Sequence, residues 1–288
     1  MQLSQRRAVF LLLGILSVGP VLAQTPNVDQ IMSQIAVHQD QAEQLRAKYA
    51  YTQKVRIRAL RGNGKLSREE YCVYNVAPTD RNTEKQLVLF KGRYEYKEHL
   101  VDYGKPGEEI PNKKIDIDAH LLPGLRDGLV NNKESRDGLG KDLFPLISAE
   151  EKKYHYEFEG EETYRGRLVY RIRFSPKKEF EGFDDDKTVW AGELLVDKAD
   201  VQPISVTTRM AKGLPLLVKT VLGTNVHQLG FTVSYARFDE GVYFPVSYGG
   251  EFGVKAVFFY KRTFTISLES TDFRRGAAES KITFEPVR

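Results

Sequence analysis

In several segments of the C-terminal third of this chain, between residues 188 and 283, an apolar side chain occurs at every second residue. Apolar side chains alternate there with polar ones, as in Phe231, Val233 and Tyr235, which are separated by threonine and serine. Because successive side chains of a strand point to opposite faces, this alternation predicts antiparallel strands with one apolar face. The same pattern occurs at 190–197, 204–210 and 263–269.

Strand patterns also occur in the N-terminal half. Residues 51–59 alternate, and Gly62-Asn63-Gly64 predicts a turn before a return strand at 66–76. Further strand pairs are expected at 86–90 with 93–97, around a turn at Gly92, and at 154–158 with 168–174, around Arg165-Gly166.

Helical spacing of apolar residues occurs in two places. The first is residues 27 to 48, where Asn27 or Asp29 can cap an amphipathic helix. The second is a loop-rich insertion at about 102–148, where short helices are expected at 119–130 and 141–147. The leucines of this insertion need an apolar surface to cover, so it either packs on the sheet or acts as a lid over it.

Residues 1–23 have the composition of a cleavable export signal. Arg6 and Arg7 form a basic start, an apolar run follows, and Val21-Leu22-Ala23 fits the small-residue rule for cleavage. The apolar run is shorter than the ~20 residues that span a bilayer, which favours a cleaved signal over a membrane anchor. We therefore predict a periplasmic protein whose mature chain, residues 24–288, forms a single domain.

Composition and charge narrow the class of protein. The chain is 41% hydrophobic and 28% charged, which is typical of a globular protein with a sizeable core. Its formal charge of +4 includes the two arginines of the signal, so the mature protein is nearly neutral and no nucleic-acid partner is expected. The single cysteine, Cys72, excludes an internal disulfide and is expected to be buried.

Common catalytic, phosphate-binding and metal-binding motifs are missing from the sequence. It contains no Gly-x-Ser-x-Gly elbow, no His-Glu-x-x-His and no phosphate loop ending in Gly-Lys-Ser/Thr. The five histidines are scattered singly, and the acidic run 184–186 lacks the glycine-containing spacing of a calcium loop. We therefore expect a protein that is not an enzyme and that needs no metal or cofactor.

Several short motifs, in their order along the chain, resemble one known family. They are Tyr51-x-Gln53-x-Val55, then Tyr170 to Phe174 with Pro176-Lys177, then Gly192 to Asp197 followed by Gln202-Pro203-Ile204, and finally Tyr235 to Phe238 with Gly241 and Pro245. With the export signal and the amphipathic helix, this order resembles the outer-membrane lipoprotein-sorting (LolA-like) superfamily of periplasmic carriers. The insertion makes this chain longer than the smallest of those carriers, and no single arginine matches the family's ligand-gating residue.

The resemblance implies an α+β fold: a strongly curved antiparallel sheet, an unclosed half-barrel, with an N-terminal helix and short helices packed in or over its concave face. It also implies an apolar ligand, a lipid or the acyl chain of a lipoprotein, held in that concavity during envelope trafficking, with an envelope protein partner and transient membrane contact. Two alternatives stay open. One is an envelope interaction or sensor module whose core is filled by its own side chains, and the less favoured one is an outer-membrane β-barrel.

Candidate ligand-binding residues are apolar and aromatic side chains at strand positions that we assign to the concave face. They are Val55, Tyr71, Val73, Leu89, Trp190, Leu194, Val206, Phe231, Tyr235, Phe264 and Ile266. Burying a chain of ~12 methylene groups at ~0.8 kcal/mol each is worth ~10 kcal/mol before the costs of binding, so such a site needs no polar motif.

Overall fold

The fold is known from a computed structural model. The structure describes residues 26–78, 83–111, 116–130, 146–178, 189–212, 226–238, 241–256 and 260–276. The predicted export signal, the acidic run at 184–186 and most of the helix expected at 141–147 lie outside these residues.

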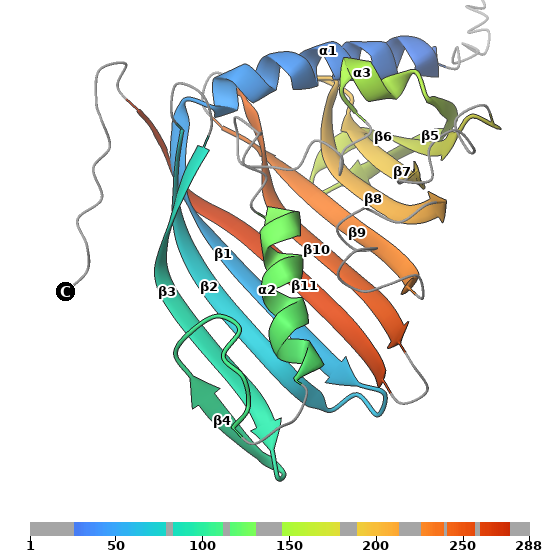
Figure 1. Ribbon diagram of the computed structural model, residues 1–288. Coiled ribbons are helices and arrows are strands. Elements are labelled where there is room, and N and C mark those ends of the chain that lie inside the picture. The colour runs from blue at the N-terminus through green and yellow to red at the C-terminus, as the bar shows by residue number, and fades with distance from the viewer. Residues whose placement is uncertain are drawn as a thin grey trace, which may run out of the picture.

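Among the described residues, eleven strands form a single antiparallel sheet. They are β1 (Tyr49–Arg61), β2 (Leu66–Pro78), β3 (Thr83–Tyr96), β4 (His99–Tyr103), β5 (Tyr154–Tyr164), β6 (Arg167–Pro176), β7 (Val189–Asp197), β8 (Gln202–Lys212), β9 (Val226–Arg237), β10 (Tyr243–Ala256) and β11 (Tyr260–Arg275). The order is β4-β3-β2-β1-β11-β10-β9-β8-β7-β6-β5, so β1 pairs with β11 and joins the two halves of the chain. The strands at the two ends, β4 and β5, are not paired with each other, which confirms the predicted unclosed, curved sheet (Figure 1).

In the part of the chain that the structure describes, three helices accompany the sheet: α1 (Val28–Arg46), α2 (Ile117–Val130) and α3 (Ser148–Glu151). The side chain of Asn27 accepts a hydrogen bond from the backbone N–H of Gln30 at 3.1 Å, which confirms one of the two predicted caps. Figure 1 shows α1 across one end of the sheet and α2 along its concave face. Of the two helices expected in the insertion, α2 is confirmed.

Within the described part of the chain, no helix is both long enough and apolar enough to cross a membrane.

The turn expected at Gly92 is wrong. Residues 83–96 form one continuous strand, and Gly92 pairs with Tyr103 of β4. A Cβ atom on Gly92 would lie 2.3 Å from the ring of Tyr103, so glycine is needed here because an aromatic ring covers the backbone. The glycine that the sequence offers as a turn signal is therefore a site of close packing.

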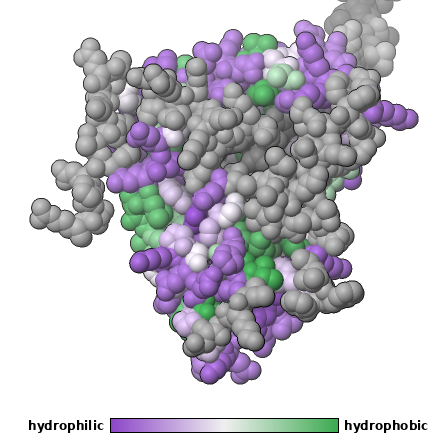
Figure 2. Space-filling model, in the orientation of Figure 1, coloured by the Kyte–Doolittle hydropathy of each residue, from purple (hydrophilic) through white to green (hydrophobic). Residues whose placement is uncertain are grey.

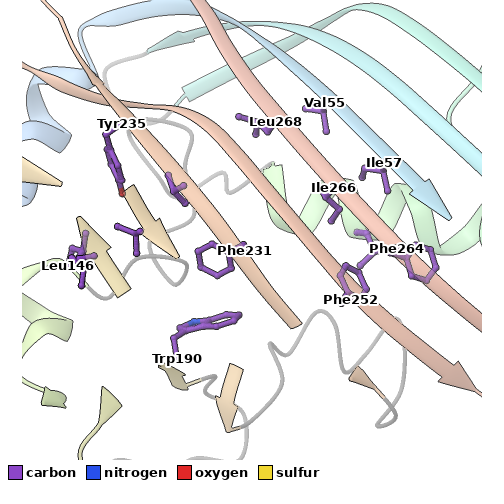
Figure 3. Packing of buried hydrophobic residues seen from close by; sticks show 14 of the residues in the cluster. Val55, Ile57, Leu146, Trp190, Phe231, Tyr235, Phe252, Phe264, Ile266 and Leu268 are labelled. Atoms are coloured by element: carbon purple, nitrogen blue, oxygen red, sulfur yellow. The ribbon is translucent and has the colours of Figure 1, made fainter. Parts of the chain in front are cut away.

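The main core lies between the concave face and the helices that cover it. Met32 and Ile35 from α1 and Leu122 and Leu125 from α2 are fully buried against the strands. Figure 3 shows part of this core, with the ring of Trp190 beside Phe231 and the ring of Phe252 beside Phe264. The centroids of these two ring pairs are 4.9 and 5.4 Å apart.

Candidate ligand-binding interior

Most of the predicted ligand-binding residues lie together on the concave face. Eight of them, at most 6% exposed, belong to the main core: Val55, Trp190, Leu194, Val206, Phe231, Tyr235, Phe264 and Ile266. They come from β1, β7, β8, β9 and β11, and strand register brings them onto one surface. The helices and the neighbouring strands therefore already cover this surface in the structure.

The other three predicted residues, Tyr71, Val73 and Leu89, do not lie on the concave face. Val55 pairs with Cys72, which is 1% exposed, so the neighbours of Cys72 in β2 point to the opposite, convex face. Leu89 pairs with Val73 and is 39% exposed. Their assignment to the concave face is wrong. The residues of β2 that face the interior are Cys72, Tyr74 and Val76, so Tyr71 and Val73, with Leu89 opposite Val73, face the other side of the sheet.

The helix α2 covers the concave face over β1 and β2. Leu121, Leu122 and Leu125 are at most 6% exposed and belong to the same core as Val55 and Ile57. Burial of a leucine side chain is worth roughly 1.5–3 kcal/mol. Three leucines thus contribute about 5–9 kcal/mol to holding α2 in place.

On its own, α2 is a poor helix. Pro123 lies inside it, and a proline in a helix interior costs about 3 kcal/mol relative to alanine. Gly124 and Gly128 each cost about a further 1 kcal/mol. Since isolated helices shorter than about 12–15 residues are marginal in water even for favourable sequences, the 14 residues of α2 depend on contacts with the sheet.

A buried group of charged residues provides part of those contacts. This charge cluster consists of Arg68, Glu70, Asp116, Asp118, Arg126 and Arg262. Arg68 Nη2 lies 2.9 Å from Asp116 Oδ2, Arg126 Nη1 lies 3.2 Å from Glu70 Oε2, and Arg262 Nε lies 3.0 Å from Asp118 Oδ2. Each ion pair joins α2, or the residue just before it, to a strand, so the cluster fixes the position of the helix.

Hydroxyl groups of neighbouring side chains complete the charge cluster. The hydroxyl of Tyr103 donates to Glu70 at 2.9 Å, and the hydroxyls of Ser67 and Tyr260 donate to Asp118 at 2.5 and 2.7 Å. Burial and the neighbouring carboxylates raise the pKa of both tyrosines well above the ordinary value. Both therefore stay neutral hydrogen-bond donors at physiological pH.

The sequence analysis missed the charge cluster, although β2 carries a signal for it. Arg68 and Glu70 are in phase with Cys72, Tyr74 and Val76, and the last three are at most 6% exposed. Two charged residues in phase with buried ones indicate buried ion pairs. Their partners are Asp116, just before α2, and Arg126 on α2, which are distant in sequence, so only the fold identifies them.

The convex face carries a shallow hollow of about 710 Å³. Register places Tyr71, Arg56, Ser267, Gly249 and Thr232 in one row across β2, β1, β11, β10 and β9, and all five line the hollow. Its lining combines serine and threonine hydroxyls and the charged residues Lys54, Arg56 and Glu269 with aromatic and aliphatic groups, so it is a mixed surface.

Within the described ranges, no three His, Cys, Asp or Glu side chains come together as a metal site. Cys72 is a buried free cysteine, as expected, and burial raises the pKa of its thiol.

The fold and its interior define a class of structure: an unclosed antiparallel half-barrel with a helix packed against its concave face. No family model and no curated protein matches the chain. Several solved structures resemble it at low sequence identity. A candidate outer membrane lipoprotein-sorting protein domain from Vibrio parahaemolyticus is 10% identical, with 86% of this chain and 95% of that chain covered, at a TM-score of 0.35.

Two others are similar to the same degree. A DUF1329 family protein from Desulfovibrio piger is 11% identical over 87% of this chain and 94% of that chain, at a TM-score of 0.34. A LolA superfamily protein from Nitrosomonas europaea is 11% identical over 83% of this chain and 92% of that chain, at a TM-score of 0.32. The superfamily named here is the one that the sequence motifs resemble.

Proposed function

We propose that this protein binds an apolar ligand, a lipid or the acyl chain of a lipoprotein, between the concave face of the sheet and α2. The observation that carries the proposal is the combination of a continuous apolar face with a poor helix as its cover. The proposed activity is binding without catalysis. Together with the predicted export signal, it places the protein in lipid or lipoprotein trafficking within the periplasm.

Energetics support an exchange between α2 and a ligand. Displacement of α2 exposes three leucines, at a cost of about 5–9 kcal/mol for their apolar contacts. An acyl chain of ~12 methylene groups regains ~10 kcal/mol on the same surface, before the costs of binding. Because the two apolar contributions are similar, an acyl chain can compete with the leucines of α2 for the concave face, while the ion pairs of the charge cluster oppose displacement of the helix.

Native mass spectrometry of the mature protein purified from its host envelope, followed by organic extraction, tests this proposal. We expect a stoichiometric acyl species that is lost on extraction. A bare protein mass, together with failure to bind a fluorescent fatty acid, would contradict ligand binding.

The filled interior also favours a second candidate function, an envelope interaction or sensor module. The eight concave candidates are at most 6% exposed, which is the burial expected of a permanent core. This function requires no lipid, so the same mass measurement separates the two. A co-purifying protein with a bare mass for this chain would support the interaction module.

A further inference from the structure

Two buried polar side chains on the concave face lack hydrogen-bond partners. Gln53 is 0% exposed and Ser270 is 5% exposed. Among the described residues, Gln53 Nε2 and Ser270 Oγ have no partner for a hydrogen bond. Buried polar atoms are nearly always paired in folded proteins, so two such atoms in one place require an explanation.

The two side chains lie next to each other. Gln53 of β1 and Ser270 of β11 are directly opposite in the antiparallel register, which places their Cβ atoms roughly 4.5–5.5 Å apart. Each is in phase with a buried residue of its strand, Val55 and Leu268, so both point to the concave face. A single acceptor oxygen can therefore receive hydrogen bonds from both.

The orientation of the Gln53 amide follows from its other contact. Lys85 Nζ donates to Gln53 Oε1 at 3.0 Å. An ammonium group has no acceptor, so the atom that faces it must be the amide oxygen, and the atom left without a partner is the N–H₂ donor.

Arg68 also has unpartnered N–H groups, but its surroundings differ. The rings of Tyr94 and Tyr103 lie with their centroids 5.4 and 4.6 Å from its guanidinium carbon and interact with it as cation–π partners. Gln53 and Ser270 are neutral, so a cation–π contact cannot replace their missing hydrogen bonds, and the pair is the stronger indication of a ligand.

The hydrogen-bond partner of Gln53 is more exposed than the pair itself. Lys85 is half-buried, and Leu87, two residues along β3, is 41% exposed. Figure 2 shows hydrophobic surface exposed on the β3 side of the sheet. In the other direction the next row of the concave face is Val55 and Leu268, and beyond it lie Ile57 and Ile266, labelled in Figure 3. The pair thus lies at the start of an apolar path.

We propose that Gln53 and Ser270 form a polar anchor for the acyl carbonyl oxygen of the ligand, which is either a carboxylate or an ester. The inference rests on the proposed function and names the ligand class: an acyl chain whose carbonyl accepts hydrogen bonds from Gln53 Nε2 and Ser270 Oγ. The hydrocarbon chain follows the apolar rows away from the anchor. A plain hydrocarbon leaves both donors unpaired and binds less well.

The test compares three ligands on the mature protein: palmitic acid, methyl palmitate and hexadecane, each by equilibrium binding of the radiolabelled compound. The double variant Gln53→Met/Ser270→Ala removes both donors with little change in volume. The matched control, Gln44→Met/Ser267→Ala, changes an exposed glutamine of α1 and a serine on the convex face of β11.

We expect the anchor variant to bind the two carbonyl ligands about tenfold more weakly than wild type does, with hexadecane unchanged. The control variant is expected to behave as wild type with all three ligands. If the anchor variant binds only palmitic acid more weakly, the anchored group is a carboxylate. If it binds both carbonyl ligands more weakly, the anchor also accepts an ester. Ser270→Ala removes a group without a partner and should not lower the melting temperature, whereas Gln53→Met also removes the hydrogen bond from Lys85 to Gln53 Oε1.

The outcomes separate the anchor from the proposed function. If wild type binds hexadecane as tightly as palmitic acid, or if the anchor variant loses all three ligands equally, the anchor is wrong and the two polar groups hold only water. If wild type binds none of the three ligands, both the proposed function and the anchor are contradicted.

Discussion

The concave face of this protein contains two polar regions, and they differ in how their polar groups are satisfied. In the charge cluster, three carboxylates face three guanidinium groups, with tyrosine and serine hydroxyls completing the contacts. In the Gln53–Ser270 pair, one donor on each side chain has no partner. The difference indicates that the charge cluster holds α2 in place, while the pair leaves hydrogen-bonding capacity for a ligand.

Removal of one charge from the cluster should have the largest effect on stability. Arg68→Met breaks the buried ion pair with Asp116, whose side chain is 0% exposed. Breaking a buried ion pair by removing one partner costs about 3–5 kcal/mol, so the free energy of unfolding in urea should fall by that amount. Arg58→Met, on an exposed residue of β1, is the control and should cost less than about 0.5 kcal/mol. Equal costs for the two variants would show that the cluster does not hold the fold.

Strengthening α2 should have the next largest effect. Pro123→Ala restores a helix donor and should stabilise α2 by up to about 3 kcal/mol. Hydrogen exchange of the α2 amides should slow, and a fluorescent fatty acid should bind more slowly, because the helix must leave the concave face. Pro111→Ala, at an exposed position before the helix, is the matched control. Slower exchange with unchanged ligand binding would contradict displacement of α2.

Alkaline pH should weaken the charge cluster through its tyrosines. The pKa values of Tyr103 and Tyr260 are raised in the folded protein by burial and by the adjacent carboxylates. The unfolded chain loses these protons near pH 10 and the folded protein does not, so stability is complete below about pH 10 and falls above it. The variant Tyr103→Phe/Tyr260→Phe should show a shallower loss of unfolding free energy between about pH 10 and 11. An identical slope in both proteins would show that the two hydroxyls do not contribute.

An ion pair on the opposite face of the same strands should matter least. Lys54 follows Gln53 in sequence, and Glu269 precedes Ser270. The charged atoms of Lys54 and Glu269 are 3.9 Å apart, and their side chains are 37% and 62% exposed. Solvent screens such a pair, so Lys54→Gln should change the unfolding free energy by less than about 0.5 kcal/mol. A cost near that of Arg68→Met would overturn the contrast between buried and exposed charges.

Local patterns were sufficient to predict several elements. The hairpin from 51 to 76, the cap at Asn27 and the helix at 119–130 follow from turn residues, capping residues and apolar periodicity, all of which act within a few residues. The strand phase in β2 could not be predicted in this way, because Tyr71 and Val73 look more apolar than Arg68 and Glu70. The two charged residues of β2 can be buried because Asp116, just before α2, and Arg126, on α2, supply opposite charges.

Gly92 and the anchor pair illustrate the same limit. A glycine in a strand and a glycine in a turn look alike in sequence, and only the ring of Tyr103 on the neighbouring strand distinguishes them. Gln53 was recognised only as part of a motif, and Ser270 was not singled out at all. Their pairing depends on contact between β1 and β11, which are separated by most of the chain.

Alternation and helical spacing are local properties of the chain, so they are enough to predict antiparallel strands with one apolar face and an amphipathic N-terminal helix. Tertiary contacts set which side chains of β2 face the interior, fix α2 through buried ion pairs, and leave two polar donors unpaired beside the apolar surface. Those features depend on pairing between distant segments, where the cost of burying a polar group is offset only by a partner that folding supplies.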